Sequence, residues 1–423
     1  MTLGVGGVSP EQALAKLQVM TAGARPIALE EYQARIAQLQ QLMQAREISA
    51  VFVDAGSTLV YFTGLKWSPS ERLVGALVPA RGEVRYIAPA FEEGTVRELQ
   101  VLPGSICVWA EHESPFTLLA GMLAEIEVHD GARVGLSHSL PFGMFERLRQ
   151  ATSKLQLVDA GALIEECRRC KSPAELALMQ RAKDMTLEVH KAAASILRGG
   201  ITTIEATRFI EAAHRKVGAP GSTFCIVLFG EDSAFPHGVR QPRPLREGDM
   251  VLIDTGCQLF GYNSDITRSY VFGSPSARQR ELWNLEKAAQ QAAFDAAVLG
   301  EPCEQVDAAA RRCLEAGGLG PDYALPGLPH RTGHGIGLDI HEGPYLVRGD
   351  RTPLDVGMCF SNEPMICVPG EFGIRLEDHF YMTAEGPRWF TQPSHSVDDP
   401  FGLDACSLVQ ERAMPAIARM ARS

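Results

Sequence analysis

The segment 330–344, with the sequence HRTGHGIGLDIHEGP, restricts what this chain can fold into more than any other stretch. It places three histidines, His330, His334 and His341, among four glycines. Such a segment has too little polar bulk for an ordinary surface loop, and histidine is the side chain that proteins most often use to handle metals and protons. We therefore interpret it as part of a reaction centre around which the chain is organised.

The first part of the chain predicts an arm followed by an α/β domain. At 423 residues the chain exceeds the usual size of one domain, so two unequal domains are expected. Residues 1–27 predict an arm that packs on another domain or subunit. Residues 28–165 alternate a helical period, as in 29–46, with short apolar runs typical of strands, such as YFTGL and ARVGLSHSL.

A second domain is predicted over 171–410. Ser172 can cap a helix, and Glu175 three positions later completes a capping box. Thr202 and Glu205 repeat the same spacing. These signals predict that the second domain begins with two helices, the first one long.

Composition and charge exclude several classes of protein. The net charge of −11 argues against nucleic-acid binding, which normally requires a basic face. No run approaches the roughly 18 apolar residues that span a bilayer, and the first residues lack the pattern of a signal peptide. Ten cysteines are too sparse for a disulfide scaffold. We expect a cytoplasmic protein with free thiols that binds neither nucleic acid nor membranes.

Cys167 and Cys170 have the spacing of a redox or zinc half-site. No second pair with this spacing follows, and the segment around them predicts a charged helix end. We interpret both as structural cysteines.

Candidate site residues occur on both sides of the histidine segment. His237 lies between Pro236 and Gly238, where it is a poor core residue. The segment 246–273 predicts a β-hairpin with Asp254 on one strand and Asp265 on the other. Two acids on facing strands repel each other, so a positive species should lie between them.

Further carboxylates follow the histidine segment. Glu363 precedes a proline, and Glu377 and Asp378 follow Arg375 in a strand-like frame. Taken alone, Arg375, Glu377 and Asp378 are typical of an exposed edge strand. With the earlier residues they complete an ordered set of one imidazole and four carboxylates: Asp254, Asp265, His334, Glu363 and Glu377.

The charge of this set indicates what occupies it. Four carboxylates carry −4, which two divalent cations balance, whereas burying them empty would raise their pKa values or unfold the site. Carboxylate ligands with one imidazole favour Mn²⁺, Fe²⁺ or Co²⁺, with Zn²⁺ as a further option. The set therefore predicts a two-metal centre, with Mn²⁺ as the first choice.

The motifs DTGCQLFGYNSDITRSY, HRTGHGIGLDIHEGP, SNEP and GIRLED occur here in the order in which the pita-bread metallopeptidases carry them. The chain resembles this family, which includes prolidase, aminopeptidase P, methionine aminopeptidase and creatinase. The resemblance implies an α/β (α+β) fold with a pita-bread catalytic domain and a smaller creatinase-type N-terminal domain. Methionine aminopeptidase lacks that N-terminal domain and creatinase lacks the metal ligands, so both are disfavoured.

The resemblance also implies roles for the site residues. Asp254 binds one metal, Asp265 and Glu377 bridge two, and His334 and Glu363 complete the second. A metal-bridging hydroxide attacks the scissile bond, with Glu363 as general base. His341 and His237 contact the substrate carbonyl and intermediate, and His330 lies in the substrate pocket. Arg375 is expected among the substrate-binding residues and as the partner that orients Glu377.

For the substrate, the resemblance implies short proline-containing peptides cut at Xaa-Pro bonds. The enzyme is then an Xaa-Pro dipeptidase, or an aminopeptidase P-like enzyme that releases the residue before proline. Phe229, Phe235 and Tyr262 are candidate walls for the proline. Family members of this type commonly associate, so we expect a homodimer.

Two other functions stay open at this point. The same fold supports a lyase or C–N hydrolase that acts on a small zwitterionic substrate, and activity on such compounds alone would indicate it. A binding protein without catalysis is the other alternative, although such relatives typically lose metal ligands and all five are present here.

Overall fold

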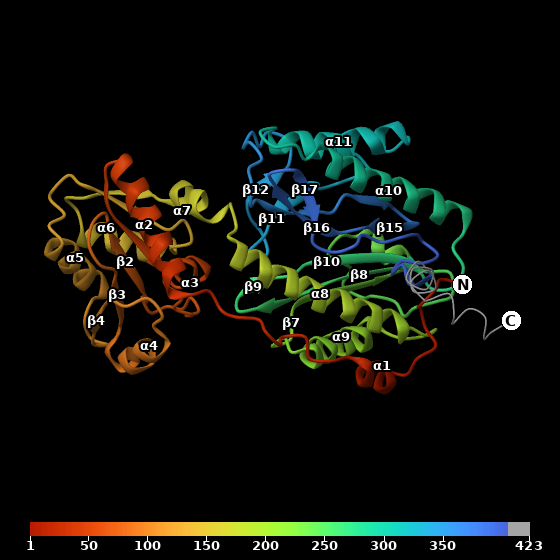
Figure 1. Ribbon diagram of the computed structural model, residues 1–423, viewed down its shortest axis with the longest axis horizontal. Helices are drawn as coiled ribbons and strands as arrows, with labels where there is room; N and C mark the ends of the chain where they lie inside the picture. The colour runs from red at the N-terminus through yellow and green to blue at the C-terminus, as the bar shows by residue number, and fades with distance from the viewer. Residues whose placement is uncertain (405–423) are drawn as a thin grey trace, which may run out of the picture. The chain divides into compact units, whose positions relative to one another are not determined.

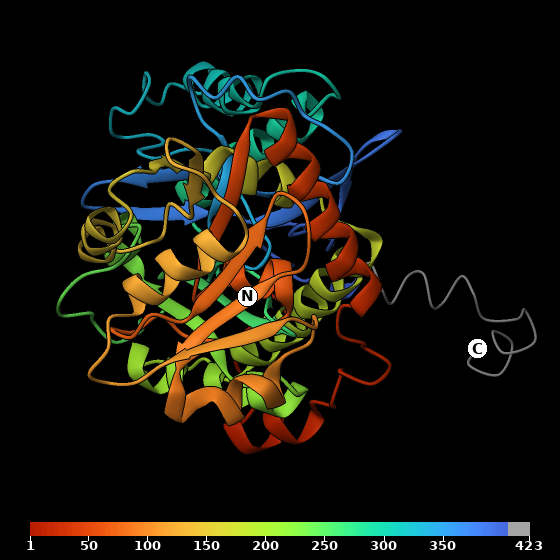
Figure 2. The ribbon, with the colours of Figure 1, turned by 90° about the vertical axis from the view of Figure 1, so that its left-hand side faces the viewer.

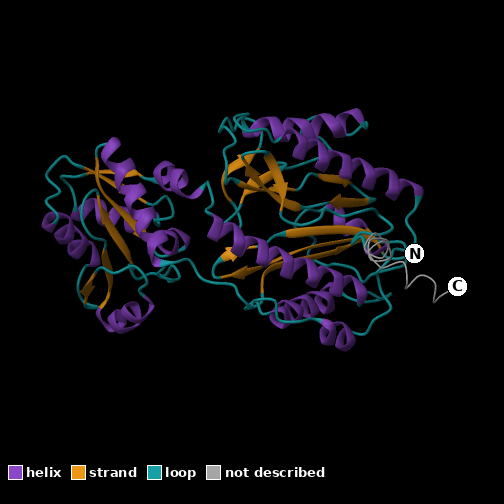
Figure 3. Cartoon of the chain, in the orientation of Figure 1, coloured by secondary structure: helices purple, strands orange, loops and turns teal. Residues whose placement is uncertain are grey.

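The computed structural model describes residues 1–404, so 405–410 of the predicted second domain lie outside the described residues. The chain folds as two units. The smaller is Pro26–Cys170, and the larger combines Met1–Arg25 with the residues from Lys171 onward. Strands and helices alternate in both, which confirms the mixed α/β class (Figure 3).

The smaller unit is built on one mixed sheet of six strands in the order β4-β3-β2-β1-β5-β6. Its strands are β1 (Ile48–Asp54), β2 (Gly75–Pro79), β3 (Arg85–Pro89), β4 (Ser105–Trp109), β5 (Arg133–Leu136) and β6 (Gln156–Asp159). Its helices are α2 (Leu29–Ala45), α3 (Ser57–Thr63), η1 (Ala90–Glu92), α4 (Glu93–Leu99), α5 (Pro115–Glu125), α6 (Phe142–Ala151) and α7 (Gly161–Arg168). Figure 2 looks onto this unit, in which α2 packs against β1 and α7.

One strand predicted in this unit is wrong. Residues 61–65, YFTGL, do not form a strand, because 57–63 form helix α3 and Gly64 ends it in the left-handed conformation with φ of 75°. Leu59 and Phe62 on this helix are fully buried. A short apolar run that is buried on all sides carries no period that separates strand from helix.

The larger unit contains three sheets, with strand orders β10-β8-β7, β12-β11-β13-β16-β17 and β14-β15, and β9 pairs with β8. The strands are β7 (Ser222–Phe229), β8 (Met250–Leu259), β9 (Tyr262–Asn263), β10 (Ile266–Val271), β11 (Gly333–Gly335), β12 (Glu342–Leu346), β13 (Cys359–Asn362), β14 (Met365–Val368), β15 (Phe372–Arg375), β16 (Asp378–Thr383) and β17 (Gly386–Trp389). The helices are α1 (Pro10–Lys16), α8 (Pro173–Ser195), α9 (Thr203–Val217), η2 (Gly230–Ala234), α10 (Ala277–Ala296) and α11 (Cys303–Ala316).

Helices cover the sheets of the larger unit on both sides (Figure 1). Helix α8 packs on β8 and α9 on β7, while α10 contacts β13 to β15 and α11 contacts β12. The predicted capping boxes are confirmed: Ser172 with Glu175 starts α8, and Thr202 with Glu205 starts α9. The first residues of the chain belong to this unit, where the backbone N–H of Gly6 donates to Ala194.

The hairpin predicted around Asp254 and Asp265 forms differently. Strand β8 turns at residues 260–261 into the short β9, and β10 begins only after Asp265. Asp254 therefore lies within β8, and Asp265 lies in the break before β10, which then pairs with β8. Gly256 permits this break, because a Cβ atom there would lie 1.9 Å from the carbonyl oxygen of Ser264.

An isolated antiparallel bridge between Thr267 of β10 and Glu377 joins two of these sheets. Beneath it, Arg268 donates 2.8 Å to the Glu377 carbonyl and forms a 2.7 Å ion pair with Asp378. Both side chains of this pair are almost completely buried, and Thr391 donates a further hydrogen bond to Asp378. This buried pair fixes the platform from which Glu377 projects.

None of the helices within residues 1–404 combines the length and the apolar composition that a membrane span requires.

Replacing Arg268 should destabilise the larger unit strongly. Arg268→Met leaves Asp378 buried without its cation, and breaking such a pair costs about 3–5 kcal/mol of the free energy of unfolding. Urea denaturation followed by circular dichroism measures this loss. The matched control is Arg280→Met, which removes an exposed pair with Asp398 and should change little. Equal stability of the two variants would contradict the role given to Arg268.

Candidate metal centre

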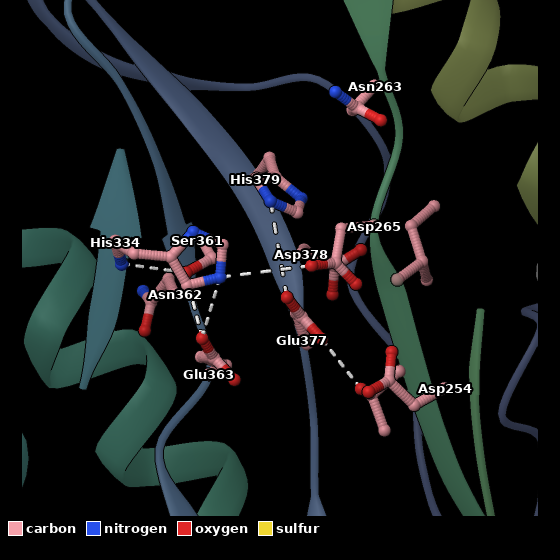
Figure 4. Close-up of polar contacts among 12 residues, drawn as sticks. Asp254, Asn263, Asp265, His334, Ser361, Asn362, Glu363, Glu377, Asp378 and His379 are labelled. Carbon is pink, nitrogen blue, oxygen red and sulfur yellow. Dashed lines mark hydrogen bonds and ion pairs between the residues drawn. The ribbon is translucent and has the colours of Figure 1, made fainter. Parts of the chain in front are cut away.

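Two sheets of the larger unit bring the five predicted metal ligands to one place (Figure 4). Strand β8 and the break before β10 carry Asp254 and Asp265 from one sheet. His334 lies in β11 of the other, Glu363 follows β13, and Glu377 lies between β15 and β16. These side chains are far apart in sequence, so the site exists only in the folded chain.

Glycines on both sides of His334 let its strand approach its neighbours. A Cβ atom at Gly333 would lie 2.1 Å from the Ser361 carbonyl oxygen, and one at Gly335 would lie 2.5 Å from that of Glu342. The ring nitrogen Nδ1 of His334 lies 3.0 Å from the Gly335 carbonyl oxygen, so this nitrogen carries the proton and donates. The other nitrogen, Nε2, is left to face the acids.

Two acids face His334, and a hydrogen bond from Ser361 orients one of them, Glu363. Nε2 of His334 lies 3.0 Å from Oε1 of Glu363 and 3.8 Å from Oδ2 of Asp265. Ser361 donates 3.1 Å to Glu363 and accepts the backbone N–H of His334 at 2.9 Å. One hydroxyl therefore links the backbone of His334 to the carboxylate of Glu363.

Arg375 contacts a different partner from the one predicted. Its guanidinium forms a buried ion pair with Asp254 rather than with Glu377. It reaches Glu377 only through Thr267, which accepts from Nε of Arg375 at 3.1 Å and donates to Oε2 of Glu377 at 2.6 Å. The sequence pattern predicts a strand that carries Arg375. It does not predict that Asp254, on a strand of another sheet, lies next to this arginine.

Burial raises the pKa of three of the carboxylates. The pKa values of Asp265 and Glu377 lie well above their ordinary range, because burial and the neighbouring acids both oppose their negative charge. Burial also raises the pKa of Asp254, although Arg375 opposes this rise. For Glu363 burial acts in the same direction, but an imidazolium at His334, which in the absence of a metal ion would also donate from Nε2 to this carboxylate, outweighs it and lowers the pKa.

The residues fit a pair of divalent cations. One oxygen each of Asp254, Asp265 and Glu377 is buried without a hydrogen-bond partner among the described residues. The potential ligand atoms of three overlapping groups lie within 4.8 Å of one another: Asp265, His334 and His341; Asp265, Glu377 and His379; His334, Glu363 and Glu377. Cations would satisfy these oxygens and remove the repulsion that raises the pKa values.

A cavity of about 440 Å³ opens onto this cluster. Its lining includes the predicted substrate residues and adds two prolines and an arginine: Pro236, His237, Pro329, His330, Arg331, His341, Glu363 and Arg375. Burial lowers the pKa of His341 to about 4 and also lowers that of His330. Both rings are therefore neutral near pH 7.

The aromatic walls predicted for this cavity lie elsewhere. Phe229 and Tyr262 are fully buried in the core, and the Tyr262 hydroxyl donates to Glu175. Phe235 is 53% exposed and is absent from the lining. Pro236 and Pro329 supply the apolar surface instead, since the strand positions of Phe229 and Tyr262 turn both rings away from the opening.

His379 was not among the site residues predicted from the sequence. It lies on β16 two positions after Glu377, is fully buried and joins the candidate ligand group of Asp265 and Glu377. Side chains two positions apart on a strand share a face, so this spacing is the signal that could have identified it. Cys167 and Cys170 have free thiols, and burial raises the pKa of Cys167 to about 12, which suits a structural cysteine.

The fold and the ring of buried acids define a metallopeptidase. The pattern of metallopeptidase family M24 matches residues 177–384, and that of the creatinase/prolidase N-terminal domain matches 35–170. The protein YkvY of Bacillus subtilis, a dipeptidase by name, is 33% identical over 362 residues, which cover 85% of this chain and 97% of that one. The chain belongs to metallopeptidase family M24.

Solved structures agree with this placement. Dipeptidase PepE of Mycobacterium ulcerans matches with a TM-score of 0.81 at 31% identity, covering 88% of this chain and 99% of that one. The prolidase of Thermococcus sibiricus matches with a TM-score of 0.78 at 30% identity, covering 85% and 97%. The larger unit therefore has the pita-bread fold, and the alternative of a lyase or C–N hydrolase is not favoured.

Metal-free protein should lose stability as the pH rises. In the unfolded chain, Asp265 and Glu377 release their protons near pH 4, whereas the folded chain retains them to higher pH. The unfolded state then binds fewer protons, so the free energy of unfolding falls between those pKa values. With chelator present, the melting temperature should be lower at about pH 8 than at about pH 5.

The control is the double variant Asp265→Asn with Glu377→Gln, in which this dependence should weaken because neither side chain titrates. Added divalent metal should raise the melting temperature of the unaltered protein more at about pH 8 than at about pH 5. Identical pH profiles for the two proteins would contradict the assignment of the buried protons.

Proposed function

We propose that this metallopeptidase is an Xaa-Pro dipeptidase that acts on short proline-containing peptides. The observation that carries the proposal is the cavity beside Glu363, which combines apolar walls with an arginine that has no carboxylate partner within residues 1–404. Pro236 and Pro329 form the walls and Arg331 is the arginine.

The walls suit a proline ring after the scissile bond. An Xaa-Pro bond has no N–H and its ring fixes the backbone, so recognition depends on shape and apolar contact. Pro236 and Pro329 are themselves rigid and offer such a surface without losing side-chain freedom when the substrate binds.

Arg331 supports a dipeptidase over an aminopeptidase. A dipeptide ends in a free carboxylate directly after the proline, and a guanidinium can bind it through two parallel hydrogen bonds. The Arg331 guanidinium is 4.4 Å from the centre of the Tyr345 ring, which limits its movement. The similar proteins YkvY, PepE and the Thermococcus enzyme bear dipeptidase or prolidase names, which is consistent with this choice.

For the metal centre, we propose that Asp254 binds one divalent ion and that Asp265 and Glu377 bind both. His334 and Glu363 then complete the second. Carboxylate ligands favour Mn²⁺, with Co²⁺, Fe²⁺ and Zn²⁺ as alternatives. When bound, the two ions would supply a hydroxide nucleophile at neutral pH and polarise the scissile carbonyl.

The chain's own groups then handle protons and orientation. Glu363 is ionised and borders the cavity, so its carboxylate can accept a proton and pass it to the leaving proline nitrogen. His341 and His237 line the same cavity and can donate ring N–H groups to the substrate carbonyl. His330 donates from Nδ1 to the Arg331 carbonyl at 2.7 Å, which leaves Nε2 to accept a hydrogen bond from the substrate.

Two further properties belong to the proposal. The nine cysteines within residues 1–404 are free thiols, which suits a reducing cytoplasm. We also propose a homodimer, because related enzymes commonly form dimers. Light scattering at micromolar concentration tests this, and a monomeric mass would contradict it.

Hydrolysis of Ala-Pro and Ala-Pro-Ala, each with Mn²⁺ and with chelator, tests the substrate. We expect chelator-sensitive cleavage of the dipeptide and little of the tripeptide. Arg331→Met should raise the KM for Ala-Pro at least about tenfold, because a charge-assisted hydrogen bond is worth about 1.5–3 kcal/mol. The matched control is Arg351→Met, an exposed arginine that lies outside the cavity and should leave KM unchanged.

Preferred cleavage of the tripeptide would replace this proposal with an aminopeptidase. Cleavage of neither peptide by protein that holds two metal ions would overturn Xaa-Pro specificity altogether.

Two substitutions separate metal binding from substrate contact. Glu377→Ala should lose both bound metal and turnover, because Glu377 is proposed to contact both ions. His341→Ala should keep the metal and lower kcat about 10²–10³-fold, as expected for a lost hydrogen bond to the developing oxyanion. Metal content by mass spectrometry and peptide hydrolysis measure the two effects. Loss of metal from the His341 variant would make this histidine a ligand instead.

A further inference from the structure

His379 is a buried imidazole without an ordinary explanation. Its side chain is fully buried, and neither ring nitrogen has a partner with the geometry of a hydrogen bond among the described residues, although the backbone of Asp265 lies near the ring. Buried polar atoms in proteins are nearly always paired, so an unpaired ring indicates a missing partner.

Other buried histidines of the same unit do have partners. Nε2 of His190 lies 2.9 Å from the Ile266 carbonyl oxygen, and only its Nδ1 lacks a partner among the described residues. The ring of His214 lies 3.2 Å from the Thr186 hydroxyl and 2.8 Å from that of Ser222. These two are structural histidines, and His379 differs from both.

The strand directs His379 at the metal centre. Glu377 and His379 are two positions apart and project to the same side, whereas Asp378 between them projects to the opposite side, where it contacts Arg268. Figure 4 shows the imidazole beside Asp265 and above Glu377. No atom of His379 lines the substrate cavity, so a substrate contact does not account for it.

The distances between the side-chain atoms of His379, Glu377 and Asp265 suit ligand atoms that bind one metal ion. Nε2 of His379 lies 4.0 Å from Oε1 of Glu377, which is too long for a hydrogen bond. Two donors that each lie about 2.0–2.2 Å from one cation can be separated by up to about 4.4 Å. Potential ligand atoms of Asp265, Glu377 and His379 all lie within 4.8 Å of one another, and Oδ1 of Asp265 and Oε1 of Glu377 have no hydrogen-bond partner.

We propose that His379 is a further metal ligand, which joins Asp265 and Glu377 and gives the centre a second imidazole beside His334. This inference rests on the proposed metal centre. Its consequence is a change in metal preference, because imidazole favours Co²⁺ and Zn²⁺ over Mn²⁺ more strongly than carboxylates do. The protein should therefore prefer Co²⁺ over Mn²⁺ more strongly than it would with His334 as its only imidazole ligand.

The test compares His379→Gln with His214→Gln, a matched loss of a buried imidazole that lies outside the centre. Dissociation constants for Co²⁺ and Mn²⁺ are measured by competition with a chelator, and circular dichroism checks folding. For His379→Gln we expect Co²⁺ affinity to fall at least about tenfold and Mn²⁺ affinity to fall much less. The His214 variant should keep both affinities.

Proton NMR of the Co²⁺-loaded proteins gives a second readout. Exchangeable N–H signals of metal-bound imidazoles shift far outside the ordinary range, and His379→Gln should lose one such signal that the unaltered protein shows. His379→Leu serves the same purpose if the glutamine variant does not fold.

An unchanged set of shifted signals, or an equal fall in affinity for both ions, would overturn the assignment of His379. Unaltered protein that takes up no cobalt would instead overturn the metal centre, and this inference with it.

Discussion

The larger unit depends on one electrostatic constraint, which is the crowding of four carboxylates in a buried place. Each charge that leaves water costs several kcal/mol unless a partner compensates it. The fold compensates in part: Arg375 pairs with Asp254, and hydroxyl groups of Thr267 and Ser361 donate to two of the acids. The atoms left unpaired define where cations are required.

The sheets of this unit hold that arrangement in place. Asp254 and Asp265 come from one sheet, and the other proposed ligands lie in or directly beside strands of the others. Small residues let the strands approach closely, as at Gly333, where any side chain would collide with the Ser361 carbonyl. The buried pair of Arg268 and Asp378 stabilises the place where Thr267 and Glu377 join two sheets. Paired strands and buried charges therefore set the positions of the proposed metal ligands.

Much of this could be predicted from the sequence, because the signals are local. Each capping box, at Ser172 and at Thr202, marks the start of a helix within four residues. Acidic residues that stand among apolar, glycine or proline neighbours likewise indicate metal ligands. Partners across sheets could not be predicted. The pairing of Arg375 with Asp254 joins residues 121 positions apart, and the missing partner of His379 is visible only when its whole surroundings are known. The prediction of a strand at helix α3 failed for another reason, because its apolar run has no period that separates strand from helix.

The bridge between Thr267 and Glu377 belongs both to the backbone pairing of two sheets and to the proposed metal centre. Ion occupancy and the cohesion of the sheets are therefore thermodynamically linked, because whatever strengthens one favours the other. A substitution in a distant strand that loosens this junction would appear in solution as weaker metal affinity. Evolutionary change in the outer layers of the molecule can thus tune the metal content of the enzyme without altering a single ligand.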